Sequence, residues 1–372
     1  MASALFPTSV YVDRLARVRA TMAEQGVDVL LLSVGPDLPW LTGYTAMPLE
    51  RLTMLVVPRD ADATMVIPRL EAPRVAEQPG VFSLRTWNET DDPIAIVAEL
   101  TGAAPVAAIG DHTWARFLVD LFKAMAGTRF ERTVGVTGPL RMAKDVAEID
   151  RLVAAGAAAD RVAAQLHAGE IALVGRPEAD VSAEISARLI AEGHDKVNFA
   201  IVAAGANAAS PHHHASDRVI AAGETVLFDF GGTMHGYCSD ITRCVSIGEP
   251  SAEVAAAYAV LHEAQAAGVA AGHVGVPCEE VDGATRRIIA AAGYGDYFIH
   301  RTGHGIGMEE HEDPYMVSGN QLPLAAGHAY SVEPGIYVPG RFGLRLEDIV
   351  VATEAGPQAL NHANHDLVVL DR

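Results

Sequence analysis

Four carboxylates interrupt apolar, strand-like stretches in the second half of the chain. Asp229 stands within the run VLFDFGG, and Asp240 follows eleven residues later in YCSDITR. Glu333 lies in YSVEPG, and Glu347 lies in LRLEDI. A carboxylate in a buried strand is unfavourable unless it is paired or bound to a cation. Four of them on strands of one sheet would repel one another, and divalent cations would remove that conflict.

A histidine with glycine on both sides completes this group. His304 lies in HRTGHGIG, and the glycines leave room for a ligand or a second backbone to approach the imidazole. Oxygen ligands with one imidazole and no thiolate favour Mn²⁺ or Co²⁺ over structural Zn²⁺. Each residue alone has an ordinary alternative as a turn, cap, loop or surface residue. The combination favours a site for two metal ions, because carboxylates can bridge.

The strings that contain these five residues resemble the ligand motifs of a known family. FDFGG, SDITR, HRTGHGIG, VEPGIY and RLED, in this order and spacing, are similar to the motifs of the pita-bread metallopeptidases. PHH before SDR, and HED-P after the HRTGHGIG string, resemble the proline-specific branch of Xaa-Pro dipeptidases (prolidases) and aminopeptidase P. The resemblance covers residues 140–370 closely and the N-terminal part more loosely.

This resemblance implies an α+β fold with two domains. The expected C-terminal domain, residues 144–372, is a pita-bread (creatinase/aminopeptidase-like) catalytic domain. A smaller α/β domain like the creatinase N-terminal domain is expected at residues 1–143. The chain length of 372 residues also favours two domains.

The resemblance also implies a centre of two divalent metal ions. Mn²⁺ is the expected metal, with Co²⁺ or Zn²⁺ as alternatives. Asp229 would bind one ion, His304 and Glu333 would bind the other, and Asp240 and Glu347 would bridge them. The metals would activate a water for attack on the scissile carbonyl. Glu333 would also act as the general base and carry a proton to the departing proline nitrogen.

Two further histidines match catalytic positions of the family. His212, in the run SPHHH, matches the histidine that hydrogen-bonds the substrate carbonyl and the developing oxyanion, and His311 matches its partner across the site. The adjacent His213 and His214 could instead belong to a solvated loop or a metal-binding tract, and their roles stay open.

Arginines are the candidates for binding the free carboxylate of a dipeptide, because a guanidinium can bind it bidentately. Some prolidases carry an arginine where this chain has Tyr315. Two alternatives follow: Arg301, Arg341 or Arg345 replaces that arginine, or the enzyme accepts longer peptides. Arg341 lies in a PGR turn and is free to reach into a cleft, so we expect it to be the main substrate-binding arginine, with Arg345 as the second. Thr242 and Arg345 are also expected to orient the ligand carboxylates.

The implied activity is hydrolysis of the Xaa-Pro bond of dipeptides, with small proline-containing peptides as substrates. Aminopeptidase P, which releases the N-terminal residue from longer Xaa-Pro peptides, is the alternative. A metal-free relative, acting as an amidinohydrolase or a binding module, is a remote alternative because all five ligands are present. The family also implies a homodimer.

Composition excludes several other classes. The net charge of −20 and the lack of a Lys/Arg cluster argue against binding to nucleic acid or to an anionic membrane. We predict no signal peptide and no transmembrane helix. Cys238, Cys244 and Cys278 lack metal-type spacing and are interpreted as small buried hydrophobic residues. The predicted location is the cytoplasm.

Hydrophobic periodicity predicts α/β alternation first and then, twice, two helices followed by a hairpin. Helices are expected at residues 10–26, 113–126, 146–167, 178–192, 252–272 and 279–292, and strands at 29–32, 54–57, 64–67, 106–109, 199–204, 225–230, 236–246, 329–332, 336–338 and 344–351.

Overall fold

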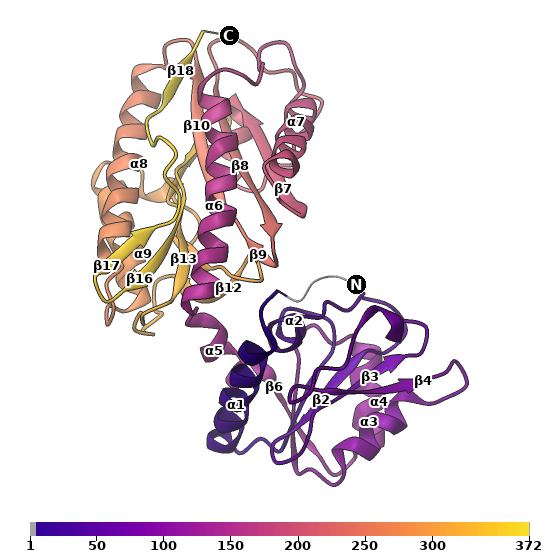
Figure 1. Ribbon diagram of the computed structural model, residues 1–372. Helices are drawn as coiled ribbons and strands as arrows, with labels where there is room; N and C mark the ends of the chain where they lie inside the picture. Colours follow the sequence, from indigo (N-terminus) through magenta and orange to yellow (C-terminus); the bar gives the residue numbers. More distant parts are fainter. Residues whose placement is uncertain (1–4, 372) are drawn as a thin grey trace. The chain divides into compact units, whose positions relative to one another are not determined.

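The computed structural model describes residues 5–371, and the chain divides into two compact units, Met1–Arg141 and Met142–Arg372 (Figure 1). The predicted domain boundary, between residues 143 and 144, falls two residues after this division. Within residues 5–371, none of the helices combines the length and the apolar character that crossing a bilayer requires.

The N-terminal unit is built on a mixed six-stranded sheet with the strand order β4-β3-β2-β1-β5-β6. Its core joins this sheet to helices α3 and α4 through Leu31, Val56, Val97, Phe117 and Leu121. The strands are β1 (Val29–Leu32), β2 (Met54–Pro58), β3 (Thr64–Pro68), β4 (Ser83–Trp87), β5 (Val106–Ile109) and β6 (Arg129–Arg132), and the helices are α1 (Thr8–Gln25), α2 (Asp37–Thr42), α3 (Pro93–Thr101), α4 (Ala115–Ala124) and, across the division, α5 (Gly138–Met142).

The second unit contains two five-stranded sheets and a two-stranded one. The first sheet has the order β18-β10-β8-β7, with β9 paired to β8, and the second has the order β12-β11-β13-β16-β17. Strands β14 and β15 form the small sheet. The strands are β7 (Lys196–Ala204), β8 (Thr225–Met234), β9 (Tyr237–Cys238), β10 (Ile241–Ile247), β11 (Gly303–Gly305), β12 (Glu312–Met316), β13 (Ala329–Val332), β14 (Gly335–Val338), β15 (Phe342–Arg345), β16 (Asp348–Thr353), β17 (Gly356–Ala359) and β18 (Val368–Leu370).

Two pairs of helices accompany these sheets, α6 (Val146–His167) with α7 (Glu178–Ala191), and α8 (Ala252–Ala271) with α9 (Cys278–Ala291). Figure 1 shows α6 and α7 beside strands β7, β8 and β10. Their buried residues form one core: Val162 and Ile185 pack with Val202, Phe228 and Phe230. Helix α9 and the end of α8 pack on the second sheet in a separate core. The predicted order of two helices and then strands, repeated once, is therefore confirmed.

Two sequence expectations about the strands are wrong. The four candidate carboxylates were expected on strands of one sheet, but the flanking strands belong to two sheets. The predicted strand at residues 344–351 is split into β15 and β16, with Leu346 and Glu347 between them. The two sheets meet at an isolated bridge between Thr242 and Glu347, so the break lets the second sheet reach the first.

The three cysteines are free thiols and are buried, as predicted. Burial raises the pKa of Cys238 to about 12 and the pKa of both Cys244 and Cys278 to about 11. Cys238 and Cys244 lie in the first sheet, on β9 and β10, and Cys278 begins α9 beside the second sheet. All three therefore act as small core residues in the folded protein.

Candidate metal centre

Asp229 is directed toward the site by the alternation of its strand. Phe228 and Phe230 are fully buried in the core beneath α6 and α7, so Asp229 projects from the opposite face of β8. Its register partner on β10 is Thr242. One carboxylate oxygen, Oδ2, accepts a hydrogen bond from Arg345, whereas Oδ1 is buried without a hydrogen-bond partner.

Asp240 and Glu347 lie at strand ends that meet where the two sheets join. Asp240 immediately precedes β10, and Glu347 lies between β15 and β16. The backbone N–H of Glu347 donates to the carbonyl of Thr242 at 3.2 Å, and the Thr242 hydroxyl donates to Glu347 Oε2 at 2.6 Å. Arg243 is fully buried and donates to the Glu347 carbonyl at 2.6 Å. These contacts hold Glu347 against the first sheet.

His304 is the central residue of the short strand β11, and its flanking glycines are required by close backbone contacts. A Cβ atom on Gly303 would overlap the carbonyl oxygen of Ser331, and one on Gly305 would overlap that of Asp313. Neighbouring strands therefore approach the backbone on both sides of His304. The backbone N–H of His304 donates to Ser331 Oγ at 3.0 Å, which holds the main chain that carries the imidazole.

Glu333 follows β13, and its side chain turns toward His304. Its backbone N–H donates to the Thr302 carbonyl at 2.8 Å, and Oε1 accepts a hydrogen bond from Ser331 Oγ at 3.2 Å. Oε1 lies 3.3 Å from His304 Nε2. Glu333 and Asp240 therefore both face Nε2 of the His304 imidazole.

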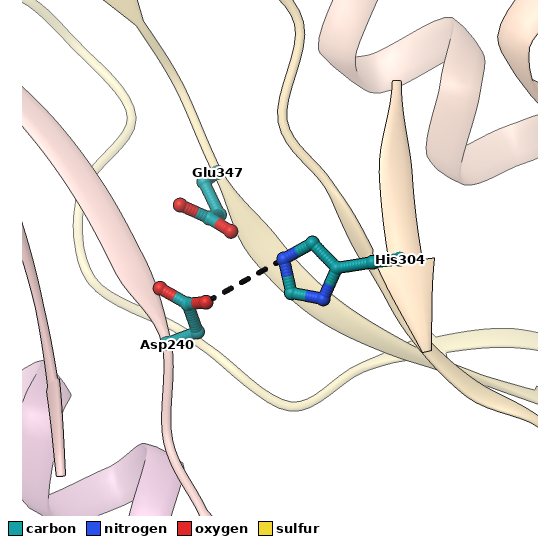
Figure 2. A group of neighbouring side chains, drawn as sticks. All are labelled: Asp240, His304 and Glu347. Atoms are coloured by element: carbon teal, nitrogen blue, oxygen red, sulfur yellow. Dashed lines mark ion pairs between the residues drawn. The ribbon is translucent and has the colours of Figure 1, made fainter. Parts of the chain in front are cut away.

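Asp240, His304 and Glu347 form a buried cluster whose ligand-type atoms all lie within 4.8 Å of one another. Figure 2 shows the three side chains pointing toward one another from separate segments of the chain, with His304 Nε2 3.7 Å from Asp240 Oδ2. The structure therefore brings together residues that are up to 107 positions apart in sequence (347 minus 240). Such convergence is the arrangement that a metal ion needs.

The carboxylates fall into two electrostatic classes. Burial, followed by the charge of Glu347, raises the pKa of Asp240 well above its ordinary value. Burial and the charges of Glu333 and Asp229 do the same to the pKa of Glu347. Burial also acts to raise the pKa of Glu333. The hydrogen bond from His304 and the positive charge of His304 outweigh burial and lower that pKa to about 2. Asp240 and Glu347 thus lack a sufficient positive partner among the residues around them.

These residues fit a pair of divalent cations. Asp229 Oδ1 is a buried oxygen with no hydrogen-bond partner, and an unpaired buried carboxylate oxygen is unfavourable. Asp240 and Glu347 are buried acids whose charge burial and mutual repulsion oppose. A bound cation would remove both penalties, because it supplies the missing partner and the missing charge.

A cavity of about 920 Å³ opens onto this cluster. His212 and His311, the expected catalytic histidines, both line it, and so do His213 and His214. The His311 ring lies 3.9 Å from the His304 ring, between centroids. Burial, followed by the charge of His304, lowers the pKa of His311 to about 4, so His311 is neutral at neutral pH.

His213, whose role the sequence left open, helps to hold the loop that carries His212. Its Nε2 lies 2.8 Å from Glu178 Oε2. Glu178 is fully buried and also accepts hydrogen bonds from the Ala204 backbone and from Ser216. His213 is therefore anchored to the first residue of α7.

The structure does not bring Arg341 to this cavity. Its side chain is 55% exposed and its guanidinium pairs with Glu253 on α8, and Arg341 is absent from the cavity lining. Arg345 lines the cavity, but its donors are used by Asp229, by Thr242 Oγ1 at 3.1 Å and by Tyr337 Oη at 2.8 Å. The side chain is 3% exposed. This arrangement suits an orienting role for Arg345 better than substrate binding, and the expectation for Arg341 is withdrawn.

Two residues in this network were not singled out from the sequence. His300 lines the cavity, and its Nε2 lies 2.8 Å from the Tyr337 hydroxyl, which also accepts a hydrogen bond from Arg345. Burial raises the pKa of Tyr337 above its usual value and lowers that of His300 below its usual value. Both lie inside the strings HRTGHGIG and VEPGIY, so their position in those motifs was the available signal.

Comparison with known proteins agrees with this geometry. Residues 150–354 match the model of metallopeptidase family M24, and residues 14–143 match the creatinase/prolidase N-terminal domain. The chain is 45% identical over 375 residues to the probable dipeptidase PepE of Mycobacterium tuberculosis, with 100% of this chain and 99% of the relative covered. It is 35% identical to an Xaa-Pro dipeptidase of Lactobacillus helveticus, with 96% and 98% covered.

A solved structure gives the same result. The crystal structure of dipeptidase PepE from Mycobacterium ulcerans superimposes with a TM-score of 0.93 at 46% identity and covers 98% of this chain and 99% of that one. The expected fold is confirmed: a creatinase-like N-terminal domain and a C-terminal pita-bread domain. Sequence, fold and site together identify this chain as an enzyme that belongs to metallopeptidase family M24.

Proposed function

We propose that this enzyme is an Xaa-Pro dipeptidase that uses two divalent metal ions held by Asp229, Asp240, His304, Glu333 and Glu347. The observation that carries the proposal is the convergence of Asp240, His304 and Glu347 within 4.8 Å, beside a buried Asp229 oxygen that has no partner. The dipeptidase and Xaa-Pro dipeptidase names of similar proteins support the substrate class. When bound, the ions would activate a water and polarise the scissile carbonyl.

The side chains around the cluster supply the remaining functions. Glu333, whose pKa is about 2, is a carboxylate at neutral pH and can accept the proton that the attacking water loses. It returns this proton to the proline nitrogen, which has no N–H in the substrate and must be protonated to leave. His212 and His311 line the same cavity and donate hydrogen bonds to the carbonyl oxygen as it gains negative charge.

The donor set favours Mn²⁺ as the physiological metal, because it consists of carboxylate oxygens and one imidazole. Co²⁺ or Zn²⁺ are alternatives. Metal analysis of the purified protein, followed by reconstitution of the chelated form with each ion, tests this assignment. Two bound ions per chain and the highest activity with Mn²⁺ are expected.

A panel of Xaa-Pro dipeptides and Xaa-Pro-Yaa tripeptides, assayed with added Mn²⁺, tests the activity. Cleavage of dipeptides is expected to exceed that of tripeptides. Faster cleavage of tripeptides would assign the enzyme to the aminopeptidase P branch. Failure to cleave any Xaa-Pro bond in the metal-loaded state would contradict both assignments.

Two further proposals concern the state of the protein in the cell. A cytoplasmic location fits the three free thiols, since reduced cysteines are usual in a reducing compartment. A homodimer follows from the family resemblance and is tested by sedimentation equilibrium of the purified chain.

A further inference from the structure

Arg301 places an unused guanidinium in the catalytic cavity. It lies three residues before His304, so the two Cα atoms are at most about 11 Å apart. The guanidinium stacks on the Tyr315 ring at 4.2 Å from the centroid, and Arg301 is one of the residues that line the cavity. Within residues 5–371, no hydrogen bond or ion pair of this guanidinium is formed.

Arg345, the other arginine that lines the cavity, already has hydrogen-bond acceptors for its guanidinium. Arg345 donates to Asp229, Thr242, Tyr337 and the Pro211 carbonyl. Arg301 instead keeps its donors available on a flat aromatic support. Stacking fixes the plane of a guanidinium while leaving its N–H groups free to bind a second planar group. A positive group held in this way is prepared for an anion.

The substrate supplies one anion at a fixed distance from the scissile bond. In an Xaa-Pro dipeptide, the carboxylate belongs to the residue that immediately follows the scissile carbonyl. A longer peptide carries a neutral amide at that point, and it would leave the guanidinium without a charged partner. A fixed cation near the reacting group therefore distinguishes dipeptides from longer peptides.

We propose that Arg301, held on the Tyr315 ring, binds the C-terminal carboxylate of the substrate and thereby sets the preference for dipeptides. This inference rests on the proposed Xaa-Pro dipeptidase activity. It assigns to Arg301 the role that the sequence gave mainly to Arg341, whose guanidinium pairs with Glu253 outside the cavity.

The test compares three substrates that differ only at the C-terminus: an Xaa-Pro dipeptide, its C-terminal amide, and the corresponding Xaa-Pro-Yaa tripeptide. Each is assayed with the Mn²⁺-loaded wild type and with Arg301→Ala, Arg301→Lys and Arg341→Ala. Metal content and circular dichroism of each variant establish that the centre and the fold are intact. Arg341→Ala is the matched control, because it removes an arginine outside the cavity.

Arg301→Ala is expected to raise KM for the dipeptide by about thirtyfold, with kcat nearly unchanged, because a charged hydrogen bond is lost. KM for the amide and the tripeptide should change by less than about threefold, since neither presents the carboxylate. Arg301→Lys should give an intermediate KM because it keeps the charge but loses the bidentate geometry. Arg341→Ala should behave as the wild type.

The outcomes separate this inference from the proposed function. Equal changes in KM for dipeptide and amide, or no change for either, would remove Arg301 from carboxylate binding while Xaa-Pro hydrolysis stands. A wild type that cleaves the amide or the tripeptide as well as the dipeptide would do the same. A wild type that cleaves none of the three would overturn the proposed function and this inference with it.

Discussion

The two sheets of the catalytic unit present their carboxylates in different ways. In the first sheet, Asp229 lies inside β8, and its direction follows from strand alternation with Phe228 and Phe230 on the opposite face. In the second sheet, Glu333 and Glu347 lie where strands stop, and individual hydrogen bonds hold them. The ladder of β8 thus positions Asp229, whereas specific hydrogen bonds position Glu333 and Glu347. Asp240, which immediately precedes β10, lies at a strand end of the first sheet.

The strongest test asks whether both sheets are needed for one metal centre. Asp240→Ala removes a proposed ligand beside the first sheet, and Glu347→Ala removes a proposed ligand beside the second. Each substitution should abolish hydrolysis and lower the metal content, because in the proposed centre a bridging carboxylate would be shared by both ions. Metal analysis and activity are measured together. Glu249→Ala, which changes an exposed acid after β10, is the control and should behave as the wild type.

Retention of full metal content and activity in either Asp240→Ala or Glu347→Ala would contradict a centre shared by the two sheets. Full activity of the chelated wild type would contradict it as well. If only one of the two variants lost metal, the ions would be bound mainly by one sheet.

The next test concerns a residue that lines the cavity without belonging to the ligand cluster. His212→Ala should lower kcat by about a hundredfold, as for the loss of one oxyanion donor. Metal content should stay at the wild-type value, because His212 is not one of the five proposed ligands. Steady-state kinetics and metal analysis of the same sample decide it. Loss of metal in proportion to activity would make His212 a ligand.

The contact between the sheets can be weakened without removing a ligand. Thr242 belongs to the ladder of the first sheet, but its hydroxyl donates to Glu347 of the second at 2.6 Å. Thr242→Val should weaken metal binding by about tenfold to a hundredfold, because the carboxylate loses the group that orients it. Competition with a chelator of known affinity measures this.

Two further substitutions test whether the effect of Thr242→Val comes from the Thr242 hydroxyl itself. Thr242→Ser keeps the hydroxyl and should restore most of the affinity. Ser246→Ala removes another buried hydroxyl of β10, which donates to Gly248, and should leave metal affinity unchanged. Equal losses in all three variants would indicate a general effect on β10 and no specific role for the Thr242 hydroxyl.

The smallest expected effect compares the acid sensitivity of the two halves of the unit. Burial, followed by the charge of Lys144, lowers the pKa of His328, beside the second sheet, to about 4. Burial lowers the pKa of His167, at the end of α6, to about 4 as well. The Ala325 N–H donates to His328 Nδ1, which requires the neutral ring. Both histidines therefore bind a proton more readily in the unfolded chain.

Between pH 6.5 and 4 the unfolded state binds more protons, so the free energy of unfolding decreases as the pH falls through this range. His328→Asn should reduce the change in the free energy of unfolding between pH 7 and pH 5 by at most about 2 kcal/mol in the metal-free protein. Urea unfolding at pH 7 and pH 5 measures it. An equal reduction of this pH dependence in His167→Asn would show that the two halves unfold together. An unchanged pH dependence in both variants would contradict the lowered pKa values of the two histidines.

Regular elements could be predicted from the sequence because their periodicity is local. Helix α6 and strands β1, β5 and β13 have the predicted bounds, because the spacing of their apolar residues fits a helix or a buried strand. Strand β4 was missed because its buried residues do not alternate: four of its five positions, from Ser83 to Thr86, are exposed or half-buried. Helix α3 begins at Pro93 with Asp92 as its N-cap, a start signal that was not used.

The candidate ligands could be named from their motifs, but their partners could not. The contact of Arg345 with Asp229 joins residues 116 positions apart, and that of Thr242 with Glu347 joins residues 105 positions apart. No local pattern specifies such a pair. The difference between Arg341 and Arg301 has the same origin. Only the folded chain shows that Arg341 forms an ion pair with Glu253 and that Arg301 stacks on Tyr315 at the cavity.

The three buried cysteines can be used as natural probes of local opening of the structure. A thiol with a raised pKa inside a packed core reacts with an alkylating reagent only while its surroundings are open. Cys238 and Cys244 sample the first sheet, and Cys278 samples the helix on the second. Labelling rates read by mass spectrometry would therefore give a separate opening free energy for each half, without introducing any probe.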